Sequence, residues 1–275
     1  MPTWSTSTMT RDRTSGGAPV GETRGVDLRS RVDAGWAEVF GIDAGELRAP
    51  GVRVVVDAPG LRGYRGCYLL RLYDACVVSA HPAVADRVRA GVRGATVDEV
   101  FDPAFVGAWA AEHAGRVLGP SWHGYMLRSD LRLPADVRAR QLGPGDADAL
   151  DELRAAVGEA DWIEAGFVHR ADVLWGVYEG GHLAAAGNMT DFDGAPADVG
   201  LVTRPSARGK GLATAVAASM CAAAAPDIPL LRYRALATNT ASLRVARRLG
   251  FVGHGANIAV RLDPEPMATA AGGMP

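Results

Sequence analysis

One stretch of the sequence constrains the fold more than any other, the run of residues from 199 to 225. An apolar run over 199–203 predicts a strand, Gly209 and Gly211 mark a short turn, and small residues over 215–225 predict a helix. A turn of this kind leaves several backbone N–H groups unpaired and pointing one way, and the helix dipole adds about half a positive charge there. Glycines let a phosphate approach the backbone, and Arg208 and Lys210 can add charge at the rim. The stretch therefore predicts an anion-binding turn.

Two other phosphate-binding motifs do not fit this stretch. A Walker A loop needs Gly-Lys followed by Ser or Thr, whereas Lys210 is followed by Gly211. A dinucleotide fingerprint needs a third glycine where this chain has Thr214, and an acidic residue about 20 positions further on. The segment 230–234 contains no carboxylate. An ordinary surface turn that caps a helix remains the structural alternative.

A second block follows at the spacing of one helix and one strand. Residues 230–236 read as a strand, and the next helix carries Leu243 and Leu249 on its apolar side. Asn239 is a natural N-terminal cap for that helix, and Gly250 is a natural left-handed residue at its end. These structural roles explain the block locally.

Together the two blocks resemble the GNAT superfamily of acetyl-CoA dependent N-acetyltransferases. The family motif Arg/Gln-x-x-Gly-x-Gly/Ala is matched by residues 208–213, and the later family block is matched by Asn239, Ser242, Gly250 and Phe251. The resemblance covers roughly residues 137–262 and implies an α/β fold, the GNAT fold, with a mixed and mostly antiparallel sheet flanked by helices. The residues around Thr203 and Pro205 also resemble a bacterial group with a divergent N-terminal half, some of whose members acetylate antibiotics.

The resemblance implies an acetyl-CoA site with no metal. Backbone N–H groups of the strand would align the pantetheine arm and polarise the thioester, and the turn would hold the pyrophosphate. The implied cofactor-binding residues are Leu201, Val202, Thr203, Arg208, Gly209, Lys210, Gly211, Leu212, Ala213, Thr214, Asn239 and Ser242. The histidines show no metal-ligand spacing.

Direct transfer of the acetyl group needs a base for the amine and a donor for the leaving thiolate. Asp198, at the start of the strand, and Glu164, on a short predicted helix, are the candidate bases, and a solvated surface carboxylate is the alternative for each. Asp191 and Asp193 are weaker candidates. Many relatives place a tyrosine acid where this chain has Ala246, so either Ser242 donates to the thiolate or the thiolate leaves unassisted.

We therefore expect an N-acetyltransferase that acts on a primary amine of a small molecule, with amine-bearing antibiotics as a subclass. A CoA-binding regulatory module without catalysis is one alternative. Acetylation of a protein N-terminus or lysine is another, but it would need an acid-lined peptide groove that nothing in the sequence indicates.

Four segments are expected along the chain: a disordered tail over 1–26, an N-terminal α/β domain over 27–134, the GNAT domain over 135–263 and a disordered tail over 264–275. The N-terminal domain would shape the acceptor site or a homodimer interface. The first half predicts helices over 27–40, 82–92 and from Asp102-Pro103 onward, and strands over 52–56, 67–72, 75–79 and 123–128. The second half predicts strands over 137–142, 173–178, 182–189 and 197–203, a helix ending near 157, a short helix over 161–167 and a polar loop over 190–196.

Composition excludes several partners. The net charge is −2 and the isoelectric point is near 6.3, so no basic face for nucleic acid or an anionic membrane is indicated. Three cysteines cannot all pair and lie in apolar contexts, which favours buried thiols and a cytoplasmic protein. No apolar run is long enough to span a bilayer, and the N-terminus lacks the apolar run of a secretion signal.

Overall fold

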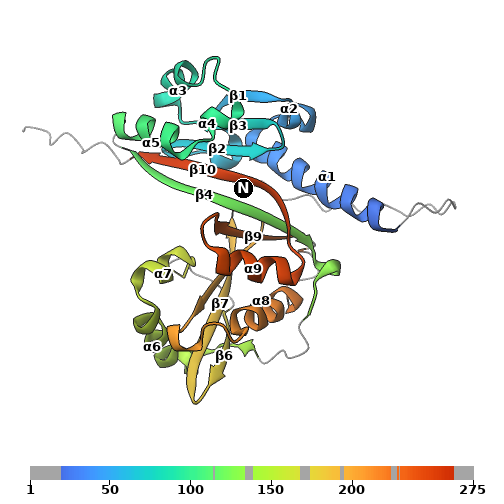
Figure 1. Ribbon diagram of the computed structural model, residues 1–275, viewed down its shortest axis with the longest axis vertical. Coiled ribbons are helices and arrows are strands. Elements are labelled where there is room, and N and C mark those ends of the chain that lie inside the picture. The colour runs from blue at the N-terminus through green and yellow to red at the C-terminus, as the bar shows by residue number, and fades with distance from the viewer. Residues whose placement is uncertain are drawn as a thin grey trace, which may run out of the picture. The chain divides into compact units, whose positions relative to one another are not determined.

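The structure is a computed structural model that describes residues 20–113, 115–133, 139–167, 174–192, 195–223, 228 and 230–262 (Figure 1). The chain divides into two compact units, and both are discontinuous in sequence. Unit 1 comprises Met1–Gly35 and Trp122–His254, and unit 2 comprises Trp36–Ser121 and Gly255–Pro275. The boundaries fall inside one helix, α1 (Val20–Phe40), and two strands, β4 (Gly115–Leu127) and β10 (Val252–Leu262).

Unit 2 contains a small mixed sheet in the order β1, β3, β2, β10. The β1–β3 pair is parallel, and the β3–β2 and β2–β10 pairs are antiparallel. Valine and alanine side chains from α3, α4 and α5 pack with residues of β2, β3 and β10 in one apolar cluster. The bounds of these elements and of the neighbouring helix α2 are α2 (Ala44–Arg48), β1 (Gly51–Val56), β2 (Gly66–Leu72), β3 (Ala75–Ala80), α3 (Ala85–Gly91), α4 (Val97–Val100) and α5 (Pro103–Glu112). Short 3-10 turns lie at Pro59–Leu61 and Pro82–Val84.

Unit 1 contains a larger sheet, in which β4 is followed by β9, β8, β7, β6 and β5. Only the β8–β9 pair is parallel among the strand pairs from β9 to β5, so the expected mixed and mostly antiparallel sheet is confirmed. The elements are β5 (Arg140–Gln141), α6 (Ala147–Val157), α7 (Glu159–Glu164), β6 (Leu174–Glu179), β7 (His182–Phe192), β8 (Ala195–Thr203), α8 (Leu212–Ala223), β9 (Leu230–Leu236) and α9 (Thr240–Leu249), with 3-10 turns at Arg128–Asp130, Pro144–Asp146 and Pro205–Ala207.

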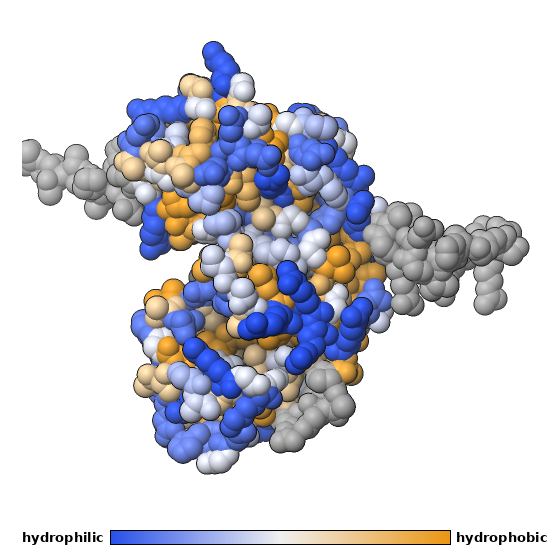
Figure 2. Space-filling view, in the orientation of Figure 1, coloured by the Kyte–Doolittle hydropathy of each residue, from blue (hydrophilic) through white to orange (hydrophobic). Residues whose placement is uncertain are grey.

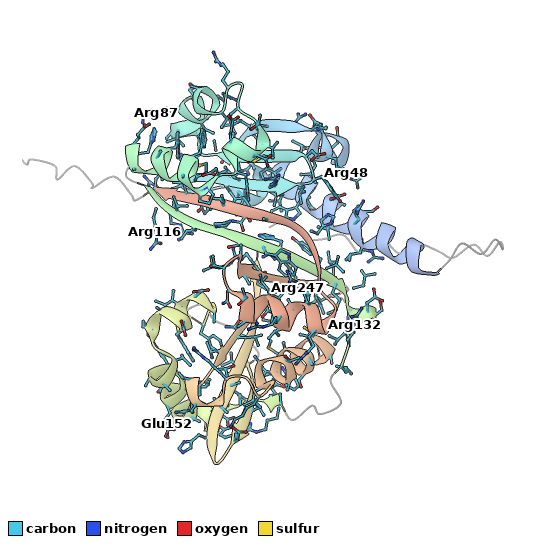
Figure 3. The ribbon with its side chains drawn as sticks, viewed as in Figure 1. Arg48, Arg87, Arg116, Arg132, Glu152 and Arg247 are labelled. Atoms are coloured by element: carbon cyan, nitrogen blue, oxygen red, sulfur yellow. The ribbon has the colours of Figure 1, made fainter. Side chains whose placement is uncertain are left out.

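Helices cover both faces of this sheet, as expected. The side chains of α8 and α9 pack with Leu231, Tyr233 and Phe251 in one cluster, and those of α6 and α7 pack with Leu183 and Val202 in another. In Figure 3 the labelled Arg247 extends from α9 and Glu152 extends from α6. Figure 2 shows an apolar area among hydrophilic residues near the middle of the visible face of unit 1.

Several expected elements differ from the structure. Helix α1 begins at Val20, so residues 20–26, which we assigned to a disordered tail, are helical. The predicted loop over 190–196 is wrong for most of its length, because β7 continues to Phe192 through a bulge and β8 already begins at Ala195. Strand β4 begins at Gly115 rather than at 123, and β10 was not expected. Residues 1–19 and 263–275, which include the rest of both predicted tails, lie outside the described residues.

The two units also differ from the two consecutive domains that we expected, 27–134 and 135–263. Strand β10 follows the last helix of unit 1, yet from Gly255 onward it belongs to unit 2 and pairs with β2. Residues 122–127 of β4, in turn, belong to unit 1. The sequence could not show this exchange, because strand pairing depends on non-local contacts.

Candidate functional site

The site is built where β8 and β9 separate. These parallel strands pair at Asp198 and Arg232, and the structure describes no later pair between residues 199–203 and 233–236. On its other edge β8 pairs antiparallel with β7, with Leu201 opposite Gly187 and Thr203 opposite Ala185. A strand uses only alternate backbone N–H groups on one edge. The other N–H groups of 199–203 therefore face the side of β9 without a strand partner there.

The Gly-rich turn lies at the carboxyl end of β8, as the sequence predicts. Gly209 and Gly211 have φ values of 82° and 80°, in the left-handed region that favours glycine. A Cβ atom added at either position would meet nothing within 4 Å, so the surface of the turn is open. Helix α8 begins at Leu212 with no acidic residue in its first turn. The first backbone N–H groups of a helix have no partner within the helix, so this open turn fits a pyrophosphate.

Both cations of the turn are ion-paired to carboxylates of neighbouring elements. The Nη2 of Arg208 lies 3.0 Å from Oδ2 of Asp161 on α7, and the Nζ of Lys210 lies 2.6 Å from Oε2 of Glu179 at the end of β6. These four side chains are 44–56% exposed. Such surface pairs contribute about 0–1 kcal/mol. A bound phosphate can therefore replace either carboxylate.

The second block also adopts its predicted geometry. Asn239 caps α9, since its side-chain oxygen accepts a hydrogen bond from the backbone N–H of Ser242 at 3.0 Å. Gly250 ends the helix in the left-handed conformation, with φ of 106°. Both β8 and β9 run into their helices at the same end of the sheet, because the strands are parallel. The implied cofactor residues from both blocks therefore lie at that end of unit 1.

The structure adds one residue to this block that sequence reasoning missed. The phenol oxygen of Tyr233, on β9, lies 2.9 Å from the hydroxyl oxygen of Ser242. Tyr233 is buried, and its ring packs edge-on against Phe251. Burial raises the pKa of Tyr233 to about 12, so the phenol keeps its proton at neutral pH. The alternation of Leu231, Tyr233 and Ala235 toward the helix face was the only sequence signal for this contact.

Asp198 is a partner of arginines. Its two oxygens lie 2.6 Å and 2.8 Å from nitrogens of Arg232, and Arg234 approaches to 3.7 Å. Burial acts to raise the pKa of Asp198, but the charges of Arg232, Arg234 and His123 outweigh it and hold that pKa below its ordinary value. A carboxylate with a lowered pKa is a weak base, so this geometry suits a structural ion pair better than proton transfer.

Glu164 lies at the exposed end of α7, close to β8. The carbonyl oxygen of the next residue, Ala165, accepts a hydrogen bond from the Asn188 side chain and packs where a Cβ atom of Gly200 would lie. Glycine at position 200 thus lets the end of α7 sit directly on β8. Glu164 is exposed and directly precedes this contact in the chain. The side chains of Asp191 and Asp193 lie outside the described residues.

Other candidate chemistry is limited in the described part of the chain. Cys67, Cys76 and Cys221 are buried free thiols, and burial raises the pKa of each to about 12. No group of three or more His, Cys, Asp or Glu side chains that could hold a metal occurs among the described residues. None of the helices described there is long and apolar enough to cross a membrane.

Residues 134–252 match the family model for the acetyltransferase (GNAT) domain. No curated protein sequence matches the chain significantly. Solved structures that the chain matches include a GNAT-family acetyltransferase from Novosphingobium aromaticivorans, at 23% identity over 55% of this chain and 68% of that one, with a TM-score of 0.41. An acetyltransferase of the same family from Colwellia psychrerythraea is 17% identical over 57% of this chain and 61% of that one, with a TM-score of 0.40. A GCN5-related N-acetyltransferase from Kribbella flavida is 15% identical over 71% of each chain, with a TM-score of 0.43.

The identities and TM-scores of these structures are too low to support an assignment, so the family is assigned from the match to the family model alone. The matched residues contain both predicted blocks, the turn after β8 and the cap of α9. Residues 134–252 therefore carry a GNAT acetyltransferase domain, which supports acyl transfer as the activity of this part of the chain.

Proposed function

We propose that the protein transfers an acetyl group from acetyl-CoA directly to a primary amine of a small molecule. The observation that carries this proposal is the open turn of Gly209 and Gly211 at the start of α8, beside the point where β8 and β9 separate. The turn offers backbone N–H groups for a pyrophosphate, and the unpaired edge of β8 offers N–H groups for an amide-containing arm.

GNAT enzymes use acetyl-CoA, which supplies an acyl group activated as a thioester. In this chain the start of α8, with Leu212, Ala213 and Thr214, would hold the pyrophosphate through backbone N–H groups. Arg208 and Lys210 would exchange their carboxylate partners for phosphate oxygens. Backbone N–H groups of Leu201 and Thr203 would align the arm and polarise the thioester carbonyl. Val202 lies between them with its side chain buried against α6 and α7, and its N–H faces β7, as that of Arg204 does two residues later.

The acceptor amine must lose a proton before it attacks. Glu164 is the better of the two proposed bases, because it is exposed beside β8, whereas Asp198 is ion-paired with Arg232. A base of this kind contributes about 10² to 10⁴ in rate. Asp198 would instead hold β8 and β9 together at the point from which they diverge.

Amine-bearing antibiotics are the subclass of acceptor that we propose to test first, because the motifs resemble a group in which some members acetylate them. Three buried thiols support a cytoplasmic location for the reaction. A homodimer, with unit 2 at its interface, stays a proposal, as does acetylation of protein amines.

The experiment measures CoA release with a thiol reagent, and mass spectrometry of the acceptors, for a panel of aminoglycosides, polyamines, amino acids and peptides. We expect an acetylated small molecule and stoichiometric CoA with the wild type, and neither with Gly211→Glu. Acetyl-CoA binding without CoA release from any acceptor would favour a regulatory module. Acetylation of peptides alone would favour a protein acetyltransferase.

A further inference from the structure

A pair of hydroxyl groups lies on β9 and α9, just beyond the last pairing position of β8 and β9. Tyr233 is the residue after Arg232, which pairs with Asp198, and its phenol reaches Ser242 in the first turn of α9 at 2.9 Å. Ser242 is half-buried, whereas Tyr233 is 1% exposed. A ligand that lies where β8 and β9 diverge can therefore contact Ser242 directly. It can interact with Tyr233 only through Ser242.

The direction of this hydrogen bond follows from its surroundings. Tyr233 packs against Phe251 and within reach of Cys221, whose pKa burial also raises to about 12, so both groups are neutral. A phenol is a stronger hydrogen-bond donor than an alcohol, so the phenol donates to the serine oxygen. The serine proton is then free to point outward, and a chain of two hydroxyls polarises its outer donor.

We propose that Ser242 donates a hydrogen bond to the sulfur of the leaving coenzyme A and that Tyr233 is the positioning residue that directs and strengthens this donor. The inference rests on the proposed function, because it requires the thiol end of coenzyme A to lie in the divergence of β8 and β9. The sequence left two alternatives, in which the thiolate either leaves with help from Ser242 or leaves unassisted. This inference favours the first.

The protons and electrons balance without a further reactant. Cleavage of the carbon–sulfur bond leaves an electron pair on sulfur, while the amine proton passes to the base. Ser242 stabilises the thiolate by a hydrogen bond and keeps its proton. Tyr233 also keeps its proton, since its pKa of about 12 exceeds the value of about 8.5 for a thiol. Solvent supplies the proton that finally neutralises the thiolate.

Binding, rather than turnover, gives the sharpest test, because it needs no acceptor. Calorimetry compares coenzyme A, which carries the thiol, with acetyl-CoA, which does not, from about pH 7 to above the thiol pKa of about 8.5. Both ligands carry the same phosphates, so the ratio of the coenzyme A affinity to the acetyl-CoA affinity is unaffected by pH effects on the phosphate site. For the wild type we expect this ratio to be about tenfold higher above the thiol pKa than at pH 7, because one hydrogen bond to an ionised group would give a gain of that size. Tyr233→Phe and Ser242→Ala should each make the ratio independent of pH, and Tyr233→Phe should leave the acetyl-CoA affinity unchanged.

Tyr178→Phe is the matched control, because its phenol bonds Asp146 at the far side of unit 1's sheet from α9, and it should keep the wild-type ratio. A flat ratio in the wild type, or an unchanged rise in Tyr233→Phe, would overturn the inference. If Tyr233→Phe does not fold, Ser242→Ala decides alone. Failure of the wild type to bind acetyl-CoA would contradict the proposed function itself and the inference with it.

Discussion

Asp198 and Arg232 form a two-bond ion pair at the position where β8 and β9 last pair, with oxygen–nitrogen distances of 2.6 Å and 2.8 Å. The arginine side chain is 4% exposed and the aspartate side chain 13%. The pair therefore holds β8 and β9 together at the point beyond which the two strands diverge, and we propose that the cofactor binds between them there.

Replacing this carboxylate should cost stability. Asp198→Asn leaves the buried Arg232 without its carboxylate, and breaking a buried ion pair costs about 3 kcal/mol or more. Denaturant unfolding measures the change in the free energy of unfolding. Asp148→Asn, an exposed change on α6, is the control and should stay within about 0.5 kcal/mol of wild type.

The stability contributed by Asp198 should depend on pH with a defined sign. Its pKa is lower in the folded protein than in the unfolded chain, where it is about 3.9. The contribution is therefore complete above about pH 4 and is lost as pH falls through the lower, folded pKa. The difference in unfolding free energy between wild type and Asp198→Asn should shrink below about pH 4. A difference that stays constant down to low pH would contradict the ion-pair assignment.

Much of the site could be predicted because its determinants are local. The turn of Gly209 and Gly211, the Asn239 cap and the end of α9 at Gly250 each follow from a few adjacent residues, and the structure has them as expected. The partners of the turn could not be predicted, since Asp161 and Glu179 reach it from α7 and β6 through tertiary packing. The same holds for Tyr233, whose partner Ser242 lies on the next element.

Neutralising the carboxylates beside the turn should strengthen cofactor binding. Asp161→Asn and Glu179→Gln each remove a competitor for Arg208 or Lys210, and exposed pairs of this kind are worth up to about 1 kcal/mol. We expect acetyl-CoA to bind up to about fivefold more tightly to each variant at low salt, with the gain screened at high salt. Calorimetry measures the affinity, and Asp148→Asn is again the control. Weaker binding to both variants would show that these carboxylates support the site.

Glu164 should be needed for the rate of acetyl transfer but not for acetyl-CoA binding. Glu164→Gln removes the proposed base, so the turnover number should fall roughly 10²-fold at neutral pH and recover partly at high pH, where free amine is abundant. The acetyl-CoA affinity should not change. Asp151→Asn, on the exposed side of α6, should keep the wild-type pH profile. A Glu164→Gln variant with wild-type rates would place the base elsewhere.

A chain that begins at residue 135 should not fold into a stable unit. It lacks β4, whose residues 122–127 lie next to β9 and contribute Met126, 1% exposed, to the core under α8 and α9. Its loss exposes the edge of β9 and leaves a cavity in that core. Circular dichroism and thermal unfolding should show a cooperative transition for the full chain and none for the chain that begins at residue 135. A cooperative transition for the shorter chain would show that residues 135–263 form a self-sufficient domain.

The most direct test of the central claim is calorimetric titration of Gly211→Glu with acetyl-CoA. The new carboxylate would lie at the start of α8, where the pyrophosphate is proposed to bind, and would repel it. Gly63→Glu is the matched control, because Gly63 in unit 2 also has a positive φ, 83°, with nothing within 4 Å of an added Cβ atom. We predict that the wild type and Gly63→Glu bind acetyl-CoA alike and that folded Gly211→Glu shows no binding. Unchanged affinity in a folded Gly211→Glu variant would contradict the assignment of this turn as the cofactor site.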